Sequence, residues 1–596
     1  MGSSSSPLYD KFHLYSTPQF LFIVPECPSS SSSSQETQIV VIDRWSGRIK
    51  LAAKAEHFPL AANVAFRKIP IFGVLGWIPA QNQPQLVVIT KRVRVGEWPD
   101  RHVVYRLEGA EIIHVCQTPI TPDTRRMVEA VSGVLTTPYF YFCYTQDLTA
   151  TRQRLFLASN ESQSPQSWLD RADERFVWNR SLLGPLLKSA AGPDIQPFLT
   201  PMIHGAVFIF KCGIQGQDVD WILVSRRSNR RVGTRFFLRG CDDHGRVSNF
   251  VETEQIVIHG SMVSSFVQTR GSMPMFWEQQ PDIRYKPKAL VTPKKESIQG
   301  FVAHFKEQVP LYGEQVIINL IDQKKAEGEL ELALKKICHE AQLKGVHYVA
   351  FDFHKECSKM RYDRLQILID SLRQHVANYG CFFYSAANPD SLQLQKGVFR
   401  TNCMDCLDRT NVVQSLLATE NLNLVLRRMG ILSPADNVLD QLEFQHIFKN
   451  AWADHADLIS IQYAGTGALK TDFTRMGVRT KYGLLQDGWN SAVRYVFNNF
   501  TDGIRTDALR FFTGEVNMEE YLKQYQKKKP SQGSLDYLPG VFLAVFIALI
   551  LTLVLTHEVS LKFFVLFLGA IGFLYLIGQM ILQNGRIWVN FPRTLQ

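Results

Sequence analysis

The twelve residues from Arg400 to Asn411 constrain the fold of this chain more than any other segment. They read Arg-Thr-Asn-Cys-Met-Asp-Cys-Leu-Asp-Arg-Thr-Asn, so five residues separate Cys403 from Arg409. The preceding stretch Lys396–Phe399 suits the end of a strand, and the apolar residues after the loop recur at helical spacing until Gly430. The segment predicts a strand, a loop of about six residues and a long helix, which is typical of α/β folds.

This arrangement can direct three groups at one phosphate. Cys403 offers a thiolate nucleophile, the loop offers backbone N–H groups, and Arg409 offers a guanidinium. The positive end of the predicted helix would stabilise both the thiolate and a bound anion. A chain with ten cysteines contains this spacing by chance about as often as not, so the setting decides the interpretation. The pattern predicts the chemistry of a cysteine-dependent phosphatase.

Two other interpretations of the loop are weaker. Cys403 and Cys406 could form half of a zinc site or a redox pair, but the sequence has no second Cys-x₂-Cys and no histidines at ligand spacing. A buried, unreactive cysteine is a common case, yet the aspartates and the arginine beside Cys403 make a poor core composition. No metal and no cofactor are expected.

Several stretches beyond the loop resemble the Sac-domain phosphoinositide phosphatases. The resemblance runs from about Tyr139 to about Met476, more than half of the chain, and includes Ser225–Ser228, Gly233–Arg235, Asn249–Gln255, Ser265–Ser272, Phe351–Lys355 and Trp452–Gly467. It implies an α/β fold with a Sac N-terminal subdomain, residues 1–125, and a catalytic phosphatase domain, residues 126–510. It also implies phosphatidylinositol phosphates as substrates, above all phosphatidylinositol 4-phosphate and other monophosphates. The short, membrane-anchored type of this family, including its plant branch, fits the chain best.

Composition and local patterns agree with this division. Strand-like runs such as Gln38–Ile42 and Leu86–Ile89 lie in the first region, and Tyr139–Cys143, Trp221–Val224 and Tyr348–Phe353 lie in the second. The serine tract from Pro28 to Ser34 predicts a surface loop. With 596 residues, of which 45% are hydrophobic, the chain is long enough for two soluble domains and a membrane anchor.

The C-terminal part of the sequence predicts a membrane anchor. Tyr537–Leu555 and Phe563–Leu582 are apolar runs of about 19 and 20 residues, each long enough to cross a bilayer core as a helix. The short connection Thr556–Lys562 predicts an antiparallel transmembrane hairpin over residues 537–582, with a buried core hairpin as the alternative. A basic juxtamembrane linker, residues 511–536, precedes the hairpin, and a cytosolic tail, residues 583–596, follows it.

Charges beside the hairpin predict its orientation. Lys523 and Lys527–Lys529 precede the first run, and Arg586 and Arg593 follow the second, so both termini and the catalytic domain are expected in the cytosol. No apolar stretch near Met1 fits a signal peptide. Spans of this length favour the thin membrane of the endoplasmic reticulum, with the Golgi or another endomembrane as the alternative. In this reducing compartment the ten cysteines are expected to be free thiols.

Two further patterns concern modification and charge. Gly2 and Ser6 fit a myristoylation pattern, which a serine run satisfies trivially. The net charge is +10, and basic residues cluster between Arg226 and Arg239 and between Lys286 and Lys295. Nucleic acid is not expected, because aromatic stacking motifs and nucleic-acid-binding modules are absent from the sequence. An anionic membrane surface is the expected partner, although part of these clusters should form solvated faces or internal ion pairs.

The loop predicts a two-step reaction. Cys403 is expected to attack phosphorus and to form a phosphocysteine that water hydrolyses, while Arg409 and the loop amides hold the phosphoryl oxygens. An inositol alkoxide is a poor leaving group, so a proton donor is required. A carboxyl group beside a thiolate and a phosphate is pushed toward its protonated form. The resemblance of the loop to that of other lipid phosphatases, which place an acid just before the Arg, implies Asp408 as the general acid, and Asp405 is the alternative.

The other loop residues are expected to bind the substrate or to shape the loop. Thr410 should steady the thiolate, and Arg400 and Asn402 should shape the loop or the headgroup pocket. The predicted substrate-binding set also contains Met404, Cys406 and Leu407. A helical stretch downstream contains Asp454, His455 and Asp457, which are not expected to take part in catalysis.

Two other functions remain as alternatives at this point. A catalytically weak, membrane-anchored protein that binds phosphoinositides or tethers membranes would show the same hairpin and basic clusters. Such a protein would have little reason to keep Cys403, Asp408 and Arg409 together. A protein tyrosine phosphatase would keep the loop, but it would need neither the hairpin nor the second acidic residue.

Overall fold

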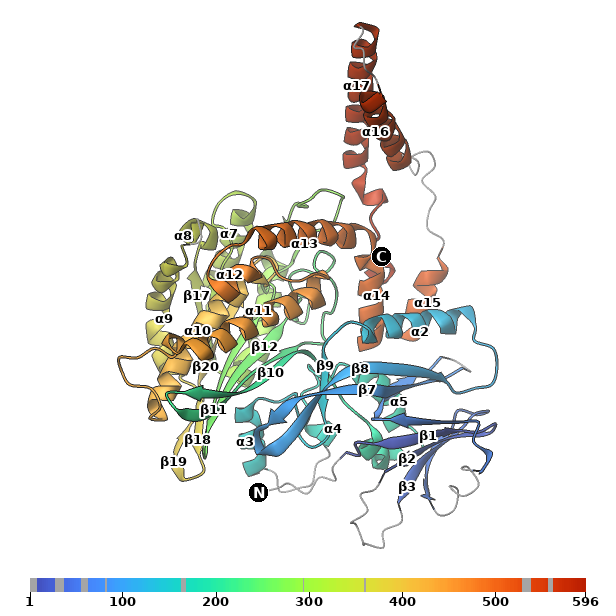
Figure 1. Cartoon of the computed structure of the whole chain (residues 1–596), viewed down its shortest axis with the longest axis vertical. Coiled ribbons are helices and arrows are strands. Elements are labelled where there is room, and N and C mark those ends of the chain that lie inside the picture. The colour runs from blue at the N-terminus through green and yellow to red at the C-terminus, as the bar shows by residue number, and fades with distance from the viewer. Residues whose placement is uncertain are drawn as a thin grey trace.

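The body of the protein consists of two β-sheets surrounded by helices, and a pair of helices projects from it (Figure 1). The computed structural model describes residues 8–26, 37–54, 63–80, 83–161, 168–292, 294–358, 361–527, 538–555 and 561–595. The predicted serine-tract loop, the predicted myristoylation site and two of the basic residues of the predicted linker, Lys528 and Lys529, lie outside the described residues.

The N-terminal sheet is antiparallel and has five strands. They are β1 (Phe12–Ser16), β2 (Phe20–Pro25), β3 (Gln38–Asp43), β4 (Ile49–Ala53) and β5 (Arg67–Ile71), in the order β4-β3-β2-β1-β5. Apolar side chains of this sheet, such as Leu21 and Val40, share one core with Trp77 and Leu86 of the larger sheet. The two sheets are therefore held together by a common apolar layer.

The larger sheet has 13 strands and passes through both predicted regions. Its strands are β6 (Val74–Ile78), β7 (Gln85–Trp98), β8 (His102–His114), β9 (Phe140–Cys143), β10 (Ile203–Ile214), β11 (Gln217–Arg227), β12 (Val251–His259), β13 (Met262–Arg270), β16 (Glu314–Asn319), β17 (Val346–Ala350), β18 (Phe382–Ser385), β19 (Asn388–Gln393) and β20 (Gly397–Asn402). The predicted boundary at residue 125 falls between β8 and β9, which are hydrogen-bonded neighbours. At the other end of the sheet, β16 pairs in parallel with both β17 and β20, and β20 pairs in parallel with β13.

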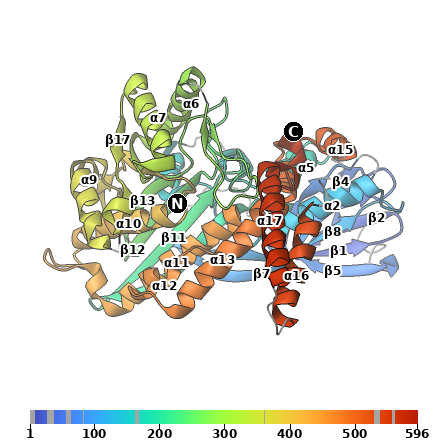
Figure 2. The same ribbon diagram turned by 90° about the horizontal axis from the view of Figure 1, so that it is seen from above.

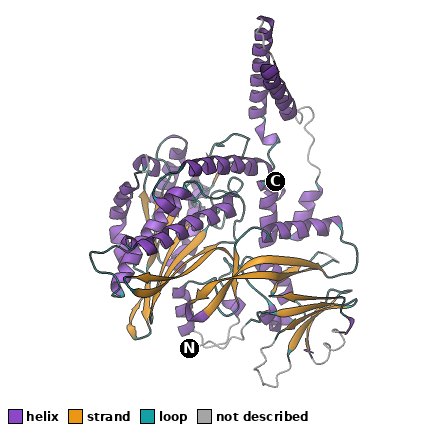
Figure 3. Cartoon of the chain, viewed as in Figure 1, coloured by secondary structure: helices purple, strands orange, loops and turns teal. Residues whose placement is uncertain are grey.

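Helices pack along this sheet, and several of them lie around its parallel end (Figures 2 and 3). The helices are α2 (Pro122–Leu135), α3 (Arg152–Glu161), α4 (Trp168–Arg171), α5 (Arg180–Leu187), α6 (Lys294–Tyr312), α7 (Lys325–Ala341), α8 (Phe353–Glu356), α9 (Leu365–Tyr379), α10 (Asp408–Arg428), α11 (Leu442–Ala464), α12 (Thr471–Met476), α13 (Lys481–Phe500), α14 (Asp502–Thr513), α15 (Met518–Gln526), α16 (Leu538–Leu555) and α17 (Leu561–Gln583); β14 (Trp277–Glu278) and β15 (Leu290–Val291) form a separate pair. The main core lies between the sheet and these helices, where Phe399 of β20 joins Leu334 of α7, Leu368 of α9 and Leu417 of α10. The predicted mixed α/β fold is confirmed.

The predicted strand and helix around Cys403 are present with different boundaries. The strand β20 continues through Asn402, three residues beyond Phe399, because its polar end is hydrogen-bonded inside the protein. The helix α10 begins at Asp408, four residues before Val412, since apolar periodicity does not mark a polar first turn. Asp408 and Arg409 therefore belong to the helix.

Two helices occupy the position of the predicted hairpin. The helices α16 and α17 lie side by side and extend away from the body (Figure 1). Many of their described apolar side chains, including Leu543 and Leu576, are exposed. Among the described residues, no helix is both long enough and apolar enough to cross a membrane. The hairpin is confirmed as a pair of helices, and this finding does not support its two predicted membrane spans.

The segments that flank the hairpin pack on the body. The predicted linker contains the end of α14 and all of α15, and its residues 528–536 lie outside the described part of the chain. After α17, the tail contains short 3₁₀ turns at Gly585–Ile587 and Arg593–Leu595. The buried Thr594 donates its N–H and its hydroxyl to the carboxylate of Asp507 on α14, at 2.9 and 2.6 Å. The tail therefore contributes to the folded body.

Candidate active site

The strand–loop–helix segment lies at the carboxyl end of parallel strands. β20 is flanked by β13 and β16, and Asn402 is in register with Asn319 of β16. The chain leaves the strand at Cys403 and enters α10 at Asp408. The carboxyl ends of parallel strands and the amino end of a helix both favour bound anions. This position suits a phosphate-binding loop.

Cys403 is buried, with 3% of its surface exposed. Its sulfur accepts a hydrogen bond from the N–H of Cys406 at 3.0 Å and another from the hydroxyl of Thr410 at 3.6 Å. An interaction with the Cys406 side chain, and then the charge of Arg409 and the Thr410 hydroxyl, lower the pKa of the Cys403 thiol and outweigh the effect of burial. The thiolate is therefore favoured at Cys403.

Cys406 has different surroundings from Cys403. Its φ of 53° lies in the left-handed region and accompanies the approach of its N–H to the Cys403 sulfur. Its own thiol donates to the carbonyl of Gly271 at 2.9 Å, and burial raises the pKa of this thiol well above its ordinary value. Both cysteines are free. Cys406 is thus a protonated neighbour of the Cys403 thiolate.

Arg409 lies on the first turn of α10 and is held by groups from β16 and α7. Its guanidinium donates to the carbonyl of Leu320 at 2.9 Å and to the carboxylate of Glu327 at 3.0 and 3.1 Å. Asp322 lies 3.6 Å away. Burial opposes the positive charge of Arg409, but the nearby Cys403 and Glu327 outweigh burial and raise the pKa of Arg409. A bidentate pair of this kind fixes the plane of the guanidinium beside the loop.

The negative charge of Asp405 is compensated by two arginines that follow β11. Its carboxylate pairs with Arg235 at 2.7 Å and with Arg239 at 2.6 Å. Burial opposes ionisation of this group, but the two guanidinium groups outweigh burial and hold the pKa of Asp405 well below its ordinary range. Asp405 is therefore ionised at neutral pH.

Asp408 has the opposite electrostatic surroundings. Its carboxyl group accepts the N–H of Leu469 at 3.1 Å. Burial raises the pKa of Asp408 and exceeds the opposing effects of the Arg494 charge and the Leu469 N–H, while the charge of Asp405 adds to the increase. Burial therefore shifts Asp408 toward its protonated form, which is the form that a proton donor requires.

Arg400 and Asn402 lie beneath the loop. Arg400 is fully buried and donates to Oδ1 of Asn402 at 3.0 Å and to the carbonyl of Ser272 at 2.7 Å, while its Nε contacts His304 at 3.0 Å. Asn402 in turn donates to the side chain of Asn319 at 2.5 Å. All their described contacts are inside the protein, so these two residues shape the loop.

Met404 and Leu407 contribute to the loop through its backbone and its packing. The carbonyl of Met404 accepts a hydrogen bond from Arg239 at 2.8 Å. Leu407 is buried in a small apolar cluster with Ile459 and Tyr463 of α11. These contacts fix the loop on its two sides.

The downstream acidic residues support the segment that holds Asp408. Asp457 of α11 accepts the N–H of Ala468 at 2.8 Å, next to Leu469, and burial raises its pKa to about 6. His455 is buried between Asn411 and Ser225, with one ring nitrogen 2.7 Å from a side-chain oxygen of each. Burial lowers the pKa of His455 well below its ordinary value, so the ring is neutral.

Several residues near the loop could not be identified from the sequence as site residues. Arg235 and Arg239 were visible only as members of a basic cluster, and their pairing with Asp405 depends on a distant turn after β11. Glu327 and Arg494 carry no motif at all. They reach the site because α7 and α13 pack beside it. From the sequence alone, the close spacing of Arg235 and Arg239 could have indicated only that an anion binds near them.

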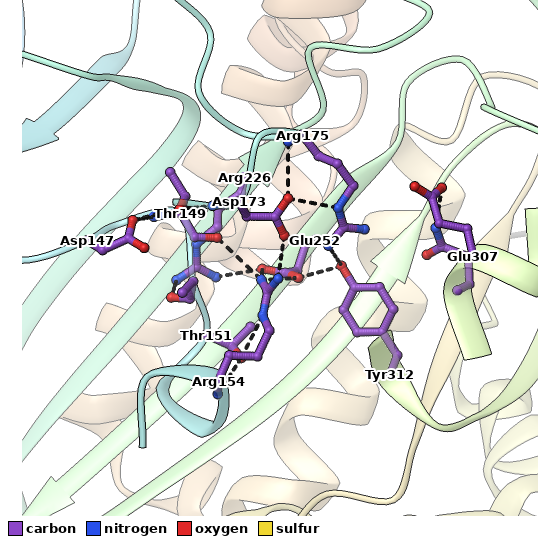
Figure 4. A network of polar contacts seen from close by, with 12 residues as sticks. Asp147, Thr149, Thr151, Arg154, Asp173, Arg175, Arg226, Glu252, Glu307 and Tyr312 are labelled. Atoms are coloured by element: carbon purple, nitrogen blue, oxygen red, sulfur yellow. Dashed lines mark hydrogen bonds and ion pairs between the residues drawn. The ribbon is translucent and has the colours of Figure 1, made fainter. Parts of the chain in front are cut away.

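The first part of the basic cluster is internal. Arg226 is fully buried and pairs with Glu252 at 2.9 Å and Glu254 at 2.8 Å. Figure 4 shows Glu252 at the centre of a network that also includes Arg154 and Tyr312. Buried charges require such compensation. Arg226 is therefore one of the basic residues that form internal ion pairs, and it stabilises the junction of α3, α6 and the sheet.

Comparisons of the sequence with known proteins identify the family of the chain. A sequence profile described as the SacI homology domain matches residues 72–358. Phosphatidylinositol-3-phosphatase SAC1-A of Danio rerio is 41% identical over 598 residues, which cover 99% of this chain and 98% of the relative. Phosphatidylinositol-3-phosphatase SAC1 of Drosophila melanogaster is 42% identical over 85% of this chain and 83% of the relative. Phosphoinositide phosphatase SAC7 of Arabidopsis thaliana is 34% identical over 99% and 98%. The chain belongs to the Sac-domain family of phosphoinositide phosphatases.

Proposed function

We propose that the Cys403 loop is the catalytic centre of this phosphoinositide phosphatase and that it removes a phosphate from the inositol ring through a phosphocysteine intermediate. One observation carries the proposal: Cys403, a thiol with a lowered pKa, begins the loop, and Asp408, a carboxyl group with a raised pKa, begins the helix that follows the loop. A nucleophile must be deprotonated while a general acid is protonated at the same pH. Family membership supports the reaction class, and this pair supports the assignment of roles.

The first step transfers the phosphoryl group to the protein. The Cys403 thiolate attacks phosphorus, and the bond between phosphorus and the ring oxygen breaks. Arg409 and the loop N–H groups bind the phosphoryl oxygens and stabilise the charge that grows on them. Asp408 donates its proton to the ring oxygen, so that the inositol leaves as an alcohol.

The second step releases phosphate. Water attacks the phosphorus of the phosphocysteine, and the ionised Asp408 accepts a proton from that water. The bond between sulfur and phosphorus breaks, which restores the Cys403 thiolate and the protonated Asp408. The same carboxyl group therefore serves as acid and then as base.

The surroundings of the two carboxyl groups favour Asp408 over Asp405 as the proton donor. Asp405 is ionised and bound to Arg235 and Arg239, so it has no proton to give at neutral pH. Its proposed role is to fix the loop against these two arginines. Thr410 is proposed to stabilise the thiolate through its hydroxyl.

Phosphatidylinositol monophosphates are the proposed substrates, with phosphatidylinositol 4-phosphate as the first candidate. Two of the relatives described above are named as 3-phosphatases, so the 3-phosphate is the second. The test is phosphate release by the full chain in detergent from short-chain monophosphates of each ring position and from a phosphotyrosine peptide, with Cys403→Ser as the blank. Monophosphates should be hydrolysed fastest. Faster hydrolysis of the peptide would contradict the proposal.

The α16–α17 hairpin is proposed to anchor the chain to a membrane, first of all that of the endoplasmic reticulum, with the catalytic body and both termini in the cytosol. The apolar sequence of the two helices and the exposure of side chains such as Phe546 and Leu576 support this proposal. Protease treatment of intact microsomes tests it. Tags at Met1 and Gln596 should both be digested from the cytosolic side, and protection of either tag would contradict this topology.

A further inference from the structure

The helix α13 exposes an apolar stripe to solvent. The stripe consists of Tyr482, Leu485, Trp489, Val496 and Phe500, whose exposed fractions are 75%, 75%, 71%, 46% and 45%. At 100° per residue these five positions fall within about 60° of one another around the helix. A contiguous exposed surface of large apolar side chains marks an interaction site more often than a solvated face. We refer to these five residues as the α13 stripe.

The inner side of α13 is polar, which reverses the usual pattern of a surface helix. Arg494, Asn498 and Asn499 are buried. Arg494 donates to the hydroxyl of Thr466 at 2.6 Å and to the carbonyl of Gly467 at 2.6 Å. Because its inner side is hydrogen-bonded to the body, the helix cannot turn its apolar stripe inward without breaking these bonds.

Hydrogen bonds link the helix that carries the stripe to the active site. The segment that Arg494 holds, residues 465–470, is the one whose Leu469 N–H binds the general acid Asp408. The carboxyl group of Asp408 and the guanidinium of Arg494 also influence each other electrostatically. A surface that docks on the α13 stripe would therefore lie against the helix that supports the catalytic acid.

The stripe also ends beside the segment that follows α17 at the base of the hairpin. The carbonyl of Asn499, next to Phe500, accepts the N–H of Asn590 in the tail at 2.6 Å. Gly585 packs so closely on the backbone of Asp282 that a Cβ there would collide with it. Figures 1 and 2 show α13 close to the base of α16 and α17. The exposed apolar surfaces of α13 and of the hairpin therefore adjoin each other.

Cations flank the stripe. The segment after β14 is bound to α13, because the hydroxyl of Tyr495 donates to the carbonyl of Ile283 at 2.6 Å. This segment exposes Lys286 and Lys288, and Lys481 is exposed at the start of α13. Aromatic and aliphatic side chains beside lysines are characteristic of helices that lie in the interface of an anionic membrane.

We propose that the α13 stripe inserts into the interfacial layer of an anionic membrane and holds the active site against the lipid headgroups. The proposal rests on the proposed function, since it supplies the membrane contact that a lipid substrate requires. The position of the stripe beside the apolar hairpin, together with its flanking lysines, favours a lipid surface over a second copy of this chain.

The test uses the full chain in vesicles of phosphatidylcholine and phosphatidylserine that contain long-chain phosphatidylinositol 4-phosphate. The double variant Leu485→Glu with Trp489→Glu should lower hydrolysis of the vesicle lipid about tenfold or more, because charged side chains do not enter the interface. Hydrolysis of a short-chain, water-soluble substrate by the same sample should stay within about twofold of the wild type, since these side chains lie outside the catalytic loop. Leu442→Glu, an equally exposed leucine on α11, is the matched control and should change neither rate.

A second measurement keeps the proposal testable if the variants behave unexpectedly. Brominated phosphatidylcholine should quench the fluorescence of the wild type more strongly than that of Trp489→Phe, because the indole would lie among the lipids. Equal quenching, or lipid hydrolysis that is unchanged in the double variant, would overturn the proposal. Loss of self-association in the double variant with normal lipid hydrolysis would overturn it in favour of a contact between copies of the chain. If the wild type hydrolyses neither substrate, the proposed function fails, while quenching still decides the role of the stripe.

Discussion

Asp405 in the loop and Asp408 at the start of α10 lie three residues apart and have opposite electrostatic surroundings. The spacing in the sequence identified both as candidate acids, and it identified Cys403 and Arg409 directly. It could not distinguish the two aspartates, because the difference arises from Arg235 and Arg239, which reach Asp405 across the fold. At the scale of single residues, motif spacing finds the groups, and tertiary charge contacts assign their protonation states.

Replacing the two cysteines of the loop should have very different effects. Cys403→Ser should lower turnover by about a thousandfold or more, because a serine hydroxyl is hardly ionised at neutral pH. Cys406→Ser should lower it by about tenfold at most, because the backbone N–H that binds the Cys403 sulfur remains and a serine hydroxyl can replace the Cys406 thiol as its neighbour. Rates with a short-chain phosphoinositide check both variants. Equal losses in the two would argue against Cys403 as the nucleophile.

The role of Asp408 predicts a dependence on leaving group and on pH. Asp408→Asn should slow lipid hydrolysis by about a hundredfold or more but hydrolysis of an aryl phosphate only mildly, since a phenolate leaves without a proton. Burial raises the pKa of Asp408, so the acid stays protonated to a higher pH than an ordinary aspartate. The value of kcat/KM for the lipid should then fall as the pH rises through that pKa, and this limb should be absent in Asp408→Asn. An unchanged pH profile in the variant would show that another group supplies the proton.

At the scale of secondary structure, helical periodicity located α10 and the hairpin helices but misplaced the start of α10. The first turn of α10 is polar and lies outside the apolar pattern. A contact made by α7 could not be predicted at all, because nothing in the sequence of this helix indicates that Glu327 binds Arg409. Such a contact depends on the parallel pairing of β16 with β20, which brings the start of α7 beside the loop.

The pair formed by Glu327 and Arg409 predicts a positioning role for α7. Glu327→Gln should reduce kcat/KM by about tenfold, since an amide cannot form the charged bidentate pair that orients the guanidinium. Glu327→Asp, which keeps the charge, should recover part of the loss. Glu329→Gln, on the same helix, serves as the control. The assignment would be wrong if Glu327→Gln and its control had the same activity.

At the scale of the whole molecule, the predicted N-terminal and catalytic regions share one continuous β-sheet. A single sheet crosses the boundary at residue 125, and the tail beyond α17 returns to α14. Local sequence patterns carry no information about such long-range pairing, because strands of the same type can join either sheet. The existence of the hairpin was predictable from its apolar sequence, whereas the return of the tail to the body was not.

The docking of the tail predicts a shared stability. Asp507 is buried and accepts hydrogen bonds from Thr594, Arg593 and Tyr525. Asp507→Asn should lower the free energy of unfolding by about 1–3 kcal/mol, because charged acceptor bonds are lost in a buried site. It should also make a C-terminal tag more sensitive to protease. The control Glu519→Gln, on the surface of α15, should do neither. Unchanged thermal unfolding in Asp507→Asn would show that the tail does not stabilise the body.

The most direct test of the account is to trap the covalent intermediate. The full chain is mixed with a phosphoinositide whose ring phosphate carries a radioactive label, quenched in acid within one turnover, digested and mapped. The label should be found on the peptide that contains Cys403, and Cys403→Ser should carry none. Labelling of a different residue, or rapid turnover with no labelled protein at any time, would contradict a phosphocysteine mechanism at this loop.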